Sequence, residues 1–391
     1  MSTPLINNTL GIITVIMGMI TAALLLQNTK FGRSLGAPLL MIIIGIILMN
    51  THVVPAYHDV YGVFLAYAVP LSMSILLMNV DIKSMLSLSK QPLLAMCSAV
   101  LCVSVSAVIF GIAFAKIIPE SWRMAGMFVG TYTGGSANLT AIAYGLDTSA
   151  DTIAAANAAD YVIGMPLMMI LFALPAFMNK SPRWNHFWPY HLTDEERANA
   201  PGLNGKKLLD AKEIALIDIG ALLFLAFCIN IFSEKLSSLL FSDSFKSSGK
   251  ILILTTVSIL LGQIPVIKKI KGKLDIGIFV AMFYYCVIGF LIDIKGFLGS
   301  TLSITIMLFF IVLLSIILHI IILRLMKIKY EYALVSITAG AAEGTSAAMV
   351  ASNGGWMSVV TIGVVLGALG AALGNYCGLG VAYLVKSILG A

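Results

Sequence analysis

The sequence predicts an all-α membrane protein with two inverted repeats of five transmembrane helices, each with a glycine-rich re-entrant hairpin or broken helix. Three observations lead to this fold class. The composition is strongly apolar, a polar glycine-rich stretch occurs once in each half of the chain, and Lys and Arg are concentrated in particular loops.

The composition excludes a soluble globular protein. Of the 391 residues, 59% are hydrophobic and 11% are charged, whereas about a quarter of a soluble domain is charged. The net charge of +6 comes from Lys and Arg in short loops, and no basic stripe with interleaved aromatic residues occurs, so nucleic acid is not expected as a partner. The five cysteines lie in apolar runs without CxxC spacing, which is typical of small hydrophobic residues.

Apolar runs long enough to cross ~30 Å of hydrocarbon define the transmembrane helices in order. In the first half they span 8–27, 36–50, 58–80, 92–117 and 150–177, with an interrupted segment at 121–146. In the second half they span 214–232, 250–267, 274–292, 301–326 and 357–387, with an interrupted segment at 331–353. The first run lacks a cleavage pattern, so we expect an uncleaved first helix and delivery to the plasma (inner) membrane of a bacterium as a multi-pass protein.

The first interrupted segment contains a polar, helix-breaking stretch at 131–138. Because unpaired backbone amides in hydrocarbon cost several kcal/mol each, this stretch should face protein or a water-filled cavity. Interrupted helices of this kind form the binding sites of secondary transporters. The alternative is structural, since Gly134 and Gly135 would also let two helices approach closely.

A second copy at 338–346 makes an internal repeat the better interpretation. With the two breaks superposed, Asn138 falls opposite Glu343, and Asp160 falls opposite Asn375 if the second half carries a short insertion between the two positions. The predicted organisation is a first repeat at 1–178, a polar cytoplasmic linker at 179–213 that divides two domains, and a second repeat at 214–391. Trp184 and Trp188 of the linker are placed as membrane-interface anchors would be.

The basic loops predict that the repeats are inverted, because short cytoplasmic loops are rich in Lys and Arg. They are the first and third loops of the first half (Lys30, Arg33, Lys83, Lys90) but the second and fourth of the second half (Lys268, Lys269, Lys271, Lys273, Lys327, Lys329). Inversion requires an odd number of crossings per half, so we expect the interrupted segments to be hairpins that enter from opposite sides, with both termini outside. The alternative is twelve crossings, with the two segments as broken helices.

Two carboxylates are predicted at membrane depth, where each costs ~2.5 to 3.5 kcal/mol. Asp160 should face a cavity, a cation or a proton relay, or else cap a helix near the interface. Glu343 either binds an alkali cation with the oxygens of its neighbours, or is protonated and bonded to backbone. A possible Na⁺ site comprises Asp160, Glu343 and Thr345. The full predicted solute and ion site is Thr131, Thr133, Gly134, Gly135, Ser136, Asn138, Asp160, Glu343, Gly344, Thr345, Ser346 and Asn375.

Other polar residues are interpreted as structural. Asn8 and Asp218 lie near the starts of the first helices of the two repeats, and His319 is alone on an apolar helix, where a hydrogen-bonded helix contact is the more common role than a proton shuttle. The chain has no GxxxxGK[ST], HExxH or GxSxG motif. We therefore expect neither an enzyme nor a cofactor, and energy from an ion gradient, in which one charge moved through 100 mV is worth ~2.3 kcal/mol.

Several motifs together resemble a known family. The 132–138 stretch (Tyr-x-Gly-Gly-Ser-x-Asn), the alanine-rich run into Asp160 and the helix end at 76–83 (Leu-x-x-Asn-x-Asp-x-Lys) look like the YjcL-like family of bacterial membrane proteins of unknown function. That family is distantly similar to the sodium:glutamate and sodium:citrate symporters and to the cation:proton antiporter and anion transporter superfamily. The resemblance implies inverted five-helix repeats, elevator-like or rocking alternation of access, and a homodimer.

One departure leaves the substrate open. The second hairpin of the family usually resembles Gly-Gly-Pro-Ala-Thr-Ala, but residues 342–347 read Ala-Glu-Gly-Thr-Ser-Ala, and no Arg lies at hairpin depth to bind a substrate carboxylate. The leading hypothesis is an ion-coupled (Na⁺ or H⁺) secondary transporter of a small polar solute. The alternatives are a monovalent cation:proton antiporter that uses Asp160 and Glu343, and a membrane sensor with a transporter fold.

Overall fold

The computed structural model describes residues 4–29, 37–83, 88–193, 196, 213–243, 245–292, 294–342 and 344–390. Every regular element in these residues is a helix, which confirms the all-α prediction. Eight helices of this described part are long and apolar enough to cross a membrane. The protein is therefore a multi-pass membrane protein.

The helices follow the predicted order in both halves of the chain. The first half contains α1 (Thr9–Leu26), α3 (Ala37–Asn50), α4 (Asp59–Leu77), α6 (Lys90–Ala113), α7 (Ser121–Gly134), α8 (Ser136–Gly145) and α9 (Ala150–Lys180), and α10 (Pro182–Phe187) lies in the linker. The second half contains α12 (Leu216–Leu240), α13 (Lys246–Gly262), α14 (Pro265–Lys268), α15 (Lys273–Phe290), α16 (Ile294–Leu325), α17 (Tyr330–Ala341), α18 (Gly344–Asn353) and α19 (Met357–Leu389).

Several predicted spans differ in their bounds from the helices at those places. The predicted span 301–326 is α16, which already begins at Ile294, and the predicted span 92–117 is α6, which ends at Ala113. The predicted span 250–267 is α13, which ends at Gly262, because Pro265 disfavours helical geometry at the residue before it and instead begins the short helix α14. The predicted span 214–232 is α12, which continues to Leu240, through a stretch in which Glu234, Lys235 and three leucines are good helix formers. Asn8 and Asp218 accept hydrogen bonds from backbone amides at the starts of α1 and α12, which confirms their structural interpretation.

The chain forms two compact units that do not coincide with its two halves. Unit 1 contains residues 1–79, 147–161 and 206–304, and unit 2 contains residues 80–146, 162–205 and 305–391. Unit 1 thus takes the first three long helices of each half, and unit 2 takes both interrupted segments. The halves 1–178 and 214–391 are therefore not compact domains, although corresponding elements of the two halves are grouped together.

Within unit 1, α3 and α15 pack at a glycine contact. A Cβ atom added to Gly45 would lie 2.9 Å from the Cα atom of Gly289. At the end of the same pair, the Asn50 side-chain amide donates a hydrogen bond of 2.9 Å to the carbonyl of Ile292. The missing side chains at this contact allow the two backbones to approach closely.

Within unit 2, α7 and α19 pack antiparallel through glycines that recur every four residues on both helices. The contacts pair Gly126 with Gly378, Gly130 with Gly374, and Gly134 with Gly370. A Cβ atom on Gly126 would lie 2.5 Å from the Gly378 carbonyl oxygen. This glycine ladder holds the first interrupted segment against the last helix.

Candidate functional site

The first interrupted segment of unit 2 is a helical hairpin. Gly135 has φ +90° and separates α7 from α8, a backbone conformation that only glycine adopts readily. A Cβ atom on Gly130 would contact Ile142 and the backbone of Asn138, on the far side of the break. Residues 130 and 142 would be ~18 Å apart in a continuous helix, so α8 folds back along α7.

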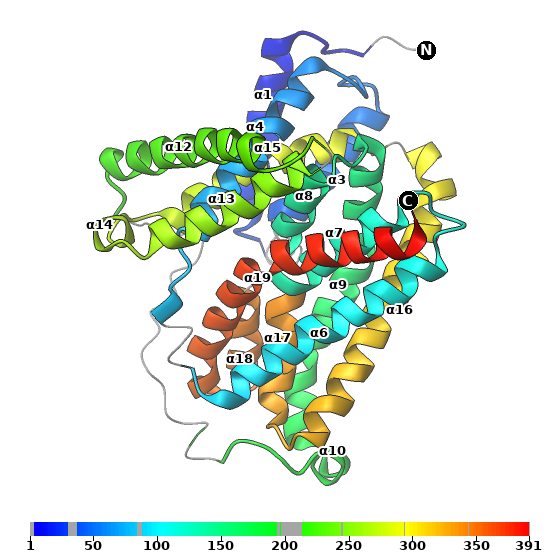
Figure 1. Ribbon diagram of the computed structural model, residues 1–391, viewed down its shortest axis with the longest axis vertical. Helices are drawn as coiled ribbons and strands as arrows, with labels where there is room; N and C mark the ends of the chain where they lie inside the picture. Colours follow the sequence, from blue (N-terminus) through cyan, green and yellow to red (C-terminus); the bar gives the residue numbers. More distant parts are fainter. Residues whose placement is uncertain are drawn as a thin grey trace. The chain divides into compact units, whose positions relative to one another are not determined.

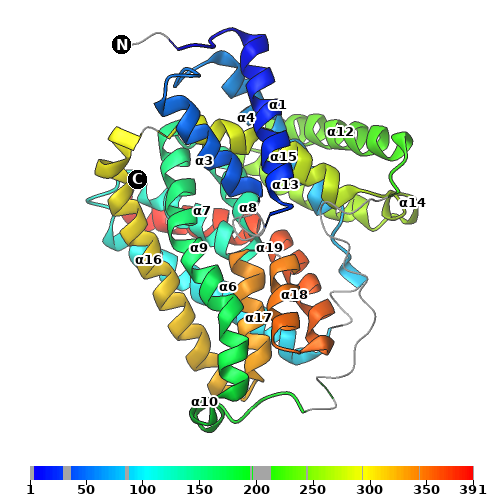
Figure 2. The same ribbon diagram turned by 180° about the vertical axis from the view of Figure 1, so that it is seen from behind.

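The second interrupted segment also breaks into two short helices. α17 ends at Ala341, α18 begins at Gly344, and the two lie side by side in both views (Figures 1 and 2). α18 packs against α19, where a Cβ atom on Gly344 would lie 2.6 Å from the Val364 carbonyl oxygen. Glu343, at the break itself, lies outside the described residues.

The breaks of the two segments meet. A Cβ atom on Gly340 would lie 2.7 Å from the carbonyl oxygen of Tyr132, and one on Gly135 would collide with the carbonyl oxygen of Ala342. α19 passes the same point, where the Asn138 side-chain amide donates a hydrogen bond of 3.2 Å to the carbonyl of Ala371. We call this place the tip junction and define it by the described residues 131–138, 340–342, 344 and 370–375.

Polar groups are buried at the tip junction. Thr131, Thr133 and Asn375 are fully buried, and Asn138 is nearly so. The Thr133 hydroxyl has no hydrogen-bond partner among the described residues, although a helical threonine commonly bonds the carbonyl four residues earlier.

Helix ends add partial charges at the same place, because α7 and α17 end there while α8 and α18 begin there. Unpaired carbonyl groups at helix ends attract cations, and unpaired amide groups at helix starts attract anionic groups. Helix ends of both signs therefore lie together with the buried hydroxyl and amide groups of the junction.

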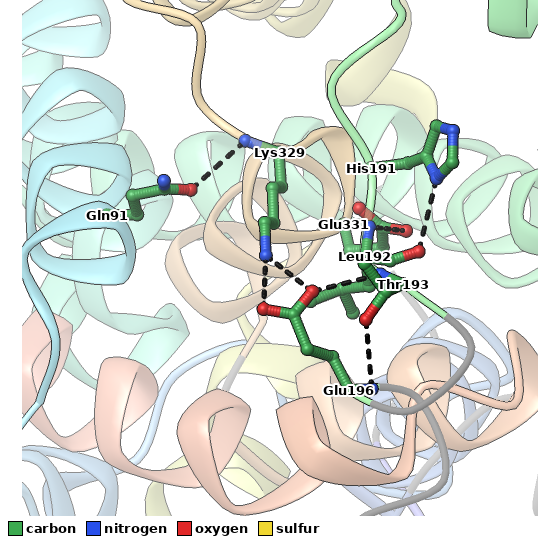
Figure 3. A network of polar contacts seen from close by, with 7 residues as sticks. All are labelled: Gln91, His191, Leu192, Thr193, Glu196, Lys329 and Glu331. Carbon is green, nitrogen blue, oxygen red and sulfur yellow. Dashed lines mark hydrogen bonds and ion pairs between the residues drawn. The ribbon is translucent and has the colours of Figure 1, made fainter.

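The base of the second segment, at the start of α17, is fastened to the linker (Figure 3). The Leu192 amide donates a hydrogen bond of 3.0 Å to the buried Glu331 carboxylate. Lys329 forms an ion pair of 2.6 Å with Glu196, and its backbone amide donates a hydrogen bond to Gln91 at the start of α6. The Lys329 ammonium group, followed by the Thr193 backbone amide, holds the pKa of the Glu196 carboxyl below its usual value by hydrogen bonding.

Trp188 corrects one prediction about the linker. It is 1% exposed, and its indole donates a hydrogen bond of 2.9 Å to the carbonyl of Ile328. Trp188 is therefore a buried contact with the α16–α17 connection and not a membrane-interface anchor, because its polar atom has a protein partner.

The base of the first segment contacts other elements. Trp122, at the start of α7, stacks under the ammonium group of Lys386 at 4.8 Å from the ring centroid, near the end of α19. A Cβ atom on Gly111, near the end of α6, would lie 2.9 Å from the Cβ atom of Ala125. The start of α17 thus lies beside the start of α6, and the start of α7 lies beside the end of α6.

Comparison with known proteins places the chain in a family. A family described as "Protein of unknown function (DUF819)" matches residues 14–388. The chain belongs to this family. It is also 24% identical, over 365 residues and 90% of each chain, to the "Uncharacterized membrane protein YjcL" of Bacillus subtilis (strain 168). The YjcL-like resemblance of the sequence motifs is thereby confirmed.

The structure of this DUF819 member brings part of the predicted site together. Eight of the predicted residues lie on the two interrupted segments or on α19 in unit 2 and are described with their side chains: Thr131, Thr133, Gly134, Gly135, Ser136, Asn138, Ser346 and Asn375. Gly344 begins α18, and the side chain of Thr345 lies outside the described residues. Asp160 is buried on the part of α9 that belongs to unit 1. In the described part of the chain no cluster of three or more His, Cys, Asp or Glu residues forms a metal site.

Residue patterns alone did not identify two contributors to the junction. One is the backbone of Ala342, and the other is the Gly370 to Gly374 stretch of α19. The four-residue spacing of glycines on α7 and on α19 was a visible signal for close helix packing. Which helix each ladder faces depends on tertiary structure.

Proposed function

We propose that this family member is an ion-coupled secondary transporter of a small polar solute, with the solute and the coupling ion (Na⁺ or H⁺) bound at the tip junction. Its two interrupted segments are re-entrant hairpins that enter the membrane from opposite faces. The transporter has no enzymatic activity and no cofactor besides its ion. It works in the plasma membrane of a bacterium, as a homodimer.

The observation that carries this proposal is the pairing of the hairpin bases with opposite ends of α6. α17 starts beside Gln91, at the first turn of α6, and α7 starts near Gly111, at its last turn. The two segments therefore run toward each other from opposite ends of one membrane helix, and their breaks meet.

Helix lengths support a meeting point inside the bilayer. At 1.5 Å per residue, the 24 residues of α6 span ~36 Å, enough to cross the hydrocarbon, while the 14 residues of α7 and the 12 of α17 span ~21 and ~18 Å. The two short helices together match the length of α6. Broken helices at mid-membrane depth are found where they surround a binding site.

The chemistry of the junction favours a neutral or zwitterionic solute. In the described part of the junction the polar groups are hydroxyls, amides and helix ends, without Lys or Arg. At the junction, Glu343 is the proposed acidic ligand of the coupling ion, with Thr345 as a neighbouring hydroxyl ligand of a possible Na⁺ site. Asp160, on the part of α9 that belongs to unit 1, is proposed separately as an ion-binding carboxylate.

Counterflow of solutes in proteoliposomes tests the function. Vesicles containing the full chain are loaded with members of a library of small polar solutes, and exchange with labelled solute is measured before a Na⁺ or pH gradient is applied. Thr133→Val keeps the side-chain shape and removes the hydroxyl, so the apparent solute affinity should fall about tenfold, as loss of a hydrogen bond of ~1.4 kcal/mol predicts.

Thr21→Val is the matched control, because the exposed Thr21 hydroxyl on α1 donates its hydrogen bond to the Met17 carbonyl. Transport by Thr133→Val at the wild-type affinity would place the solute elsewhere. Cation and proton exchange without any organic solute would instead identify a cation:proton antiporter.

A further inference from the structure

His319 lies in the middle of a buried hydrogen-bonded chain that joins three helices of unit 2. It is 1% exposed on α16. Its Nδ1 atom is 3.1 Å from the Ser98 hydroxyl oxygen on α6, and its Nε2 atom is 3.1 Å from the Ser336 hydroxyl oxygen on α17. Both ring nitrogens therefore have a partner that can donate or accept.

The partners of the serines define the tautomer of the neutral ring. Ser336 donates its single hydroxyl proton to the Ala333 carbonyl at 3.0 Å, so it accepts a hydrogen bond from Nε2–H of His319. Nδ1 then carries the lone pair and accepts from the Ser98 hydroxyl. The Cys102 thiol, 3.8 Å from Ser98, can donate to Ser98 in turn.

The same hydrogen-bonded residues can also hold a second proton on the imidazole ring of His319. When Nδ1 is protonated, Nδ1–H donates to the Ser98 oxygen, and the Ser98 hydroxyl turns to donate to the Cys102 sulfur. Only a hydroxyl and a thiol rotate, and no polar atom of the chain is left without a partner. A histidine that only joined helices would not require hydroxyl and thiol partners that exchange their donor and acceptor roles.

A small cavity lies between the hydrogen-bonded residues around His319 and the tip junction. Its volume of about 20 Å³ is enough for one water molecule. It is lined by His319 and Ser315 of α16, by Tyr132 beside the first hairpin break, and by Ala341 at the end of α17. A water there would lie between the imidazole and the residues that form the junction.

We propose that His319 binds a coupling proton of the transporter. The proton reaches Nδ1 through the water in this cavity, which relays it and stays neutral, once the Ser98 hydroxyl has turned from the ring to the Cys102 sulfur; the Ser98 and Ser336 hydroxyls stabilise both protonation states. This inference rests on the proposed function and adds a proton site on His319 to the ion site proposed at the tip junction. The reaction is a simple protonation of neutral imidazole to imidazolium.

No charged side chain among the described residues lines the cavity. Tyr132 of α7 is the second titratable group in its lining, and Cys102 of α6 joins through Ser98. On α17, the Glu331 carboxylate accepts a hydrogen bond from the linker, and on α16 the Arg324 guanidinium stacks on Phe187 of α10. α9 contributes Leu167, which is apolar.

Nitrogen NMR of ring-labelled histidines in lipid vesicles tests proton binding without any solute. The chain has five histidines, and His319→Gln assigns the His319 signals by their disappearance. We expect the Nε2–H tautomer at alkaline pH and conversion to imidazolium in the folded protein as the pH falls. A ring that stays neutral until the protein unfolds would overturn the proposal.

Ser98→Ala is the second variant, because it keeps the titratable ring and removes the acceptor of Nδ1–H. Its titration midpoint should fall by about one pH unit, as loss of a hydrogen bond to a charged group predicts. An unchanged midpoint would contradict the assigned role of Ser98. This variant also keeps the test valid if His319→Gln does not fold.

Transport separates this inference from the function on which it rests. Counterflow requires no net proton movement, so His319→Gln should retain solute counterflow and lose accumulation driven by a pH gradient. Driven accumulation that survives in His319→Gln with the wild-type pH dependence would refute the proton site and leave the transporter intact. Absence of counterflow in the wild type would refute the transporter, and the NMR titration alone would then decide proton binding.

Discussion

Asp160 shows how a single buried carboxylate limits the chemistry of this protein. It is 5% exposed within α9, in a helix long and apolar enough to cross the membrane. A carboxylate at membrane depth costs ~2.5 to 3.5 kcal/mol, which is why Asp160 is proposed above as a ligand of the coupling ion.

Asp160→Asn keeps the side-chain shape and removes the charge. We expect ion-driven uptake to be abolished while the thermal unfolding temperature in detergent stays close to that of the wild type. If Na⁺ and H⁺ compete for this carboxylate in the wild type, the apparent Na⁺ affinity should fall as the pH drops through its pKa. Wild-type uptake by Asp160→Asn at every Na⁺ concentration and pH would show that Asp160 is structural.

For single residues, the sequence indicated which polar side chains are costly to bury in a membrane, but it did not indicate their hydrogen-bond partners. Thr133 and Asn138 were predictable because a polar, helix-breaking stretch cannot face lipid. His319 was interpreted as a helix contact, and that contact exists. The two serines that make it able to accept a proton are on α6 and α17, 221 and 17 residues away along the chain, and no local pattern indicates them.

The glycine ladder between α7 and α19 is the element-scale feature that sets the position of the first hairpin. Its residues recur every four positions, so they form one stripe on each helix and allow the backbones to touch. The spacing is visible in the sequence. The pairing of the two stripes is not, because the helices are separated by more than 200 residues.

Gly126→Ala tests the ladder. The added methyl group would lie 2.5 Å from the Gly378 carbonyl oxygen and 2.6 Å from the Ala382 Cβ atom. Because both are backbone or backbone-fixed atoms, we expect destabilisation of ~1 to 3 kcal/mol, the usual cost of overpacking. Thermal unfolding of the purified protein measures the change.

Gly380→Ala is the control on α19, the helix against which Gly126 packs, since nothing lies within 4 Å of the added methyl group. Alanine is the better helix former by ~1 kcal/mol, so this variant should be as stable as the wild type or slightly more so. Equal unfolding temperatures for Gly126→Ala and Gly380→Ala would mean that the close approach of α7 and α19 does not contribute to stability.

At the scale of the whole molecule, three segments that charge assigns to one face of the membrane also contact one another within unit 2. The linker, the start of α6 and the α16–α17 connection, which carries Lys327 and Lys329, meet at one place (Figure 3). Charge alone assigned all three to the cytoplasm. The two compact units were not predictable in this way, because each combines helices from both halves of the chain.

Cysteine labelling tests the topology and the re-entrant hairpins together. In a background with the five native cysteines replaced, Thr193→Cys places an exposed thiol on the linker, and Ser387→Cys places one near the end of α19. With hairpins that do not cross, an impermeant reagent should label Ser387→Cys in intact cells and Thr193→Cys only after permeabilisation. If both segments crossed as broken helices, the chain would cross the membrane three times between the start of α6 and the linker. These two places would then lie on opposite faces of the membrane, although both contact Lys329. Labelling of Thr193→Cys from outside, or of both positions from the same face, would therefore refute the ten-span arrangement and the inward meeting of the two hairpins.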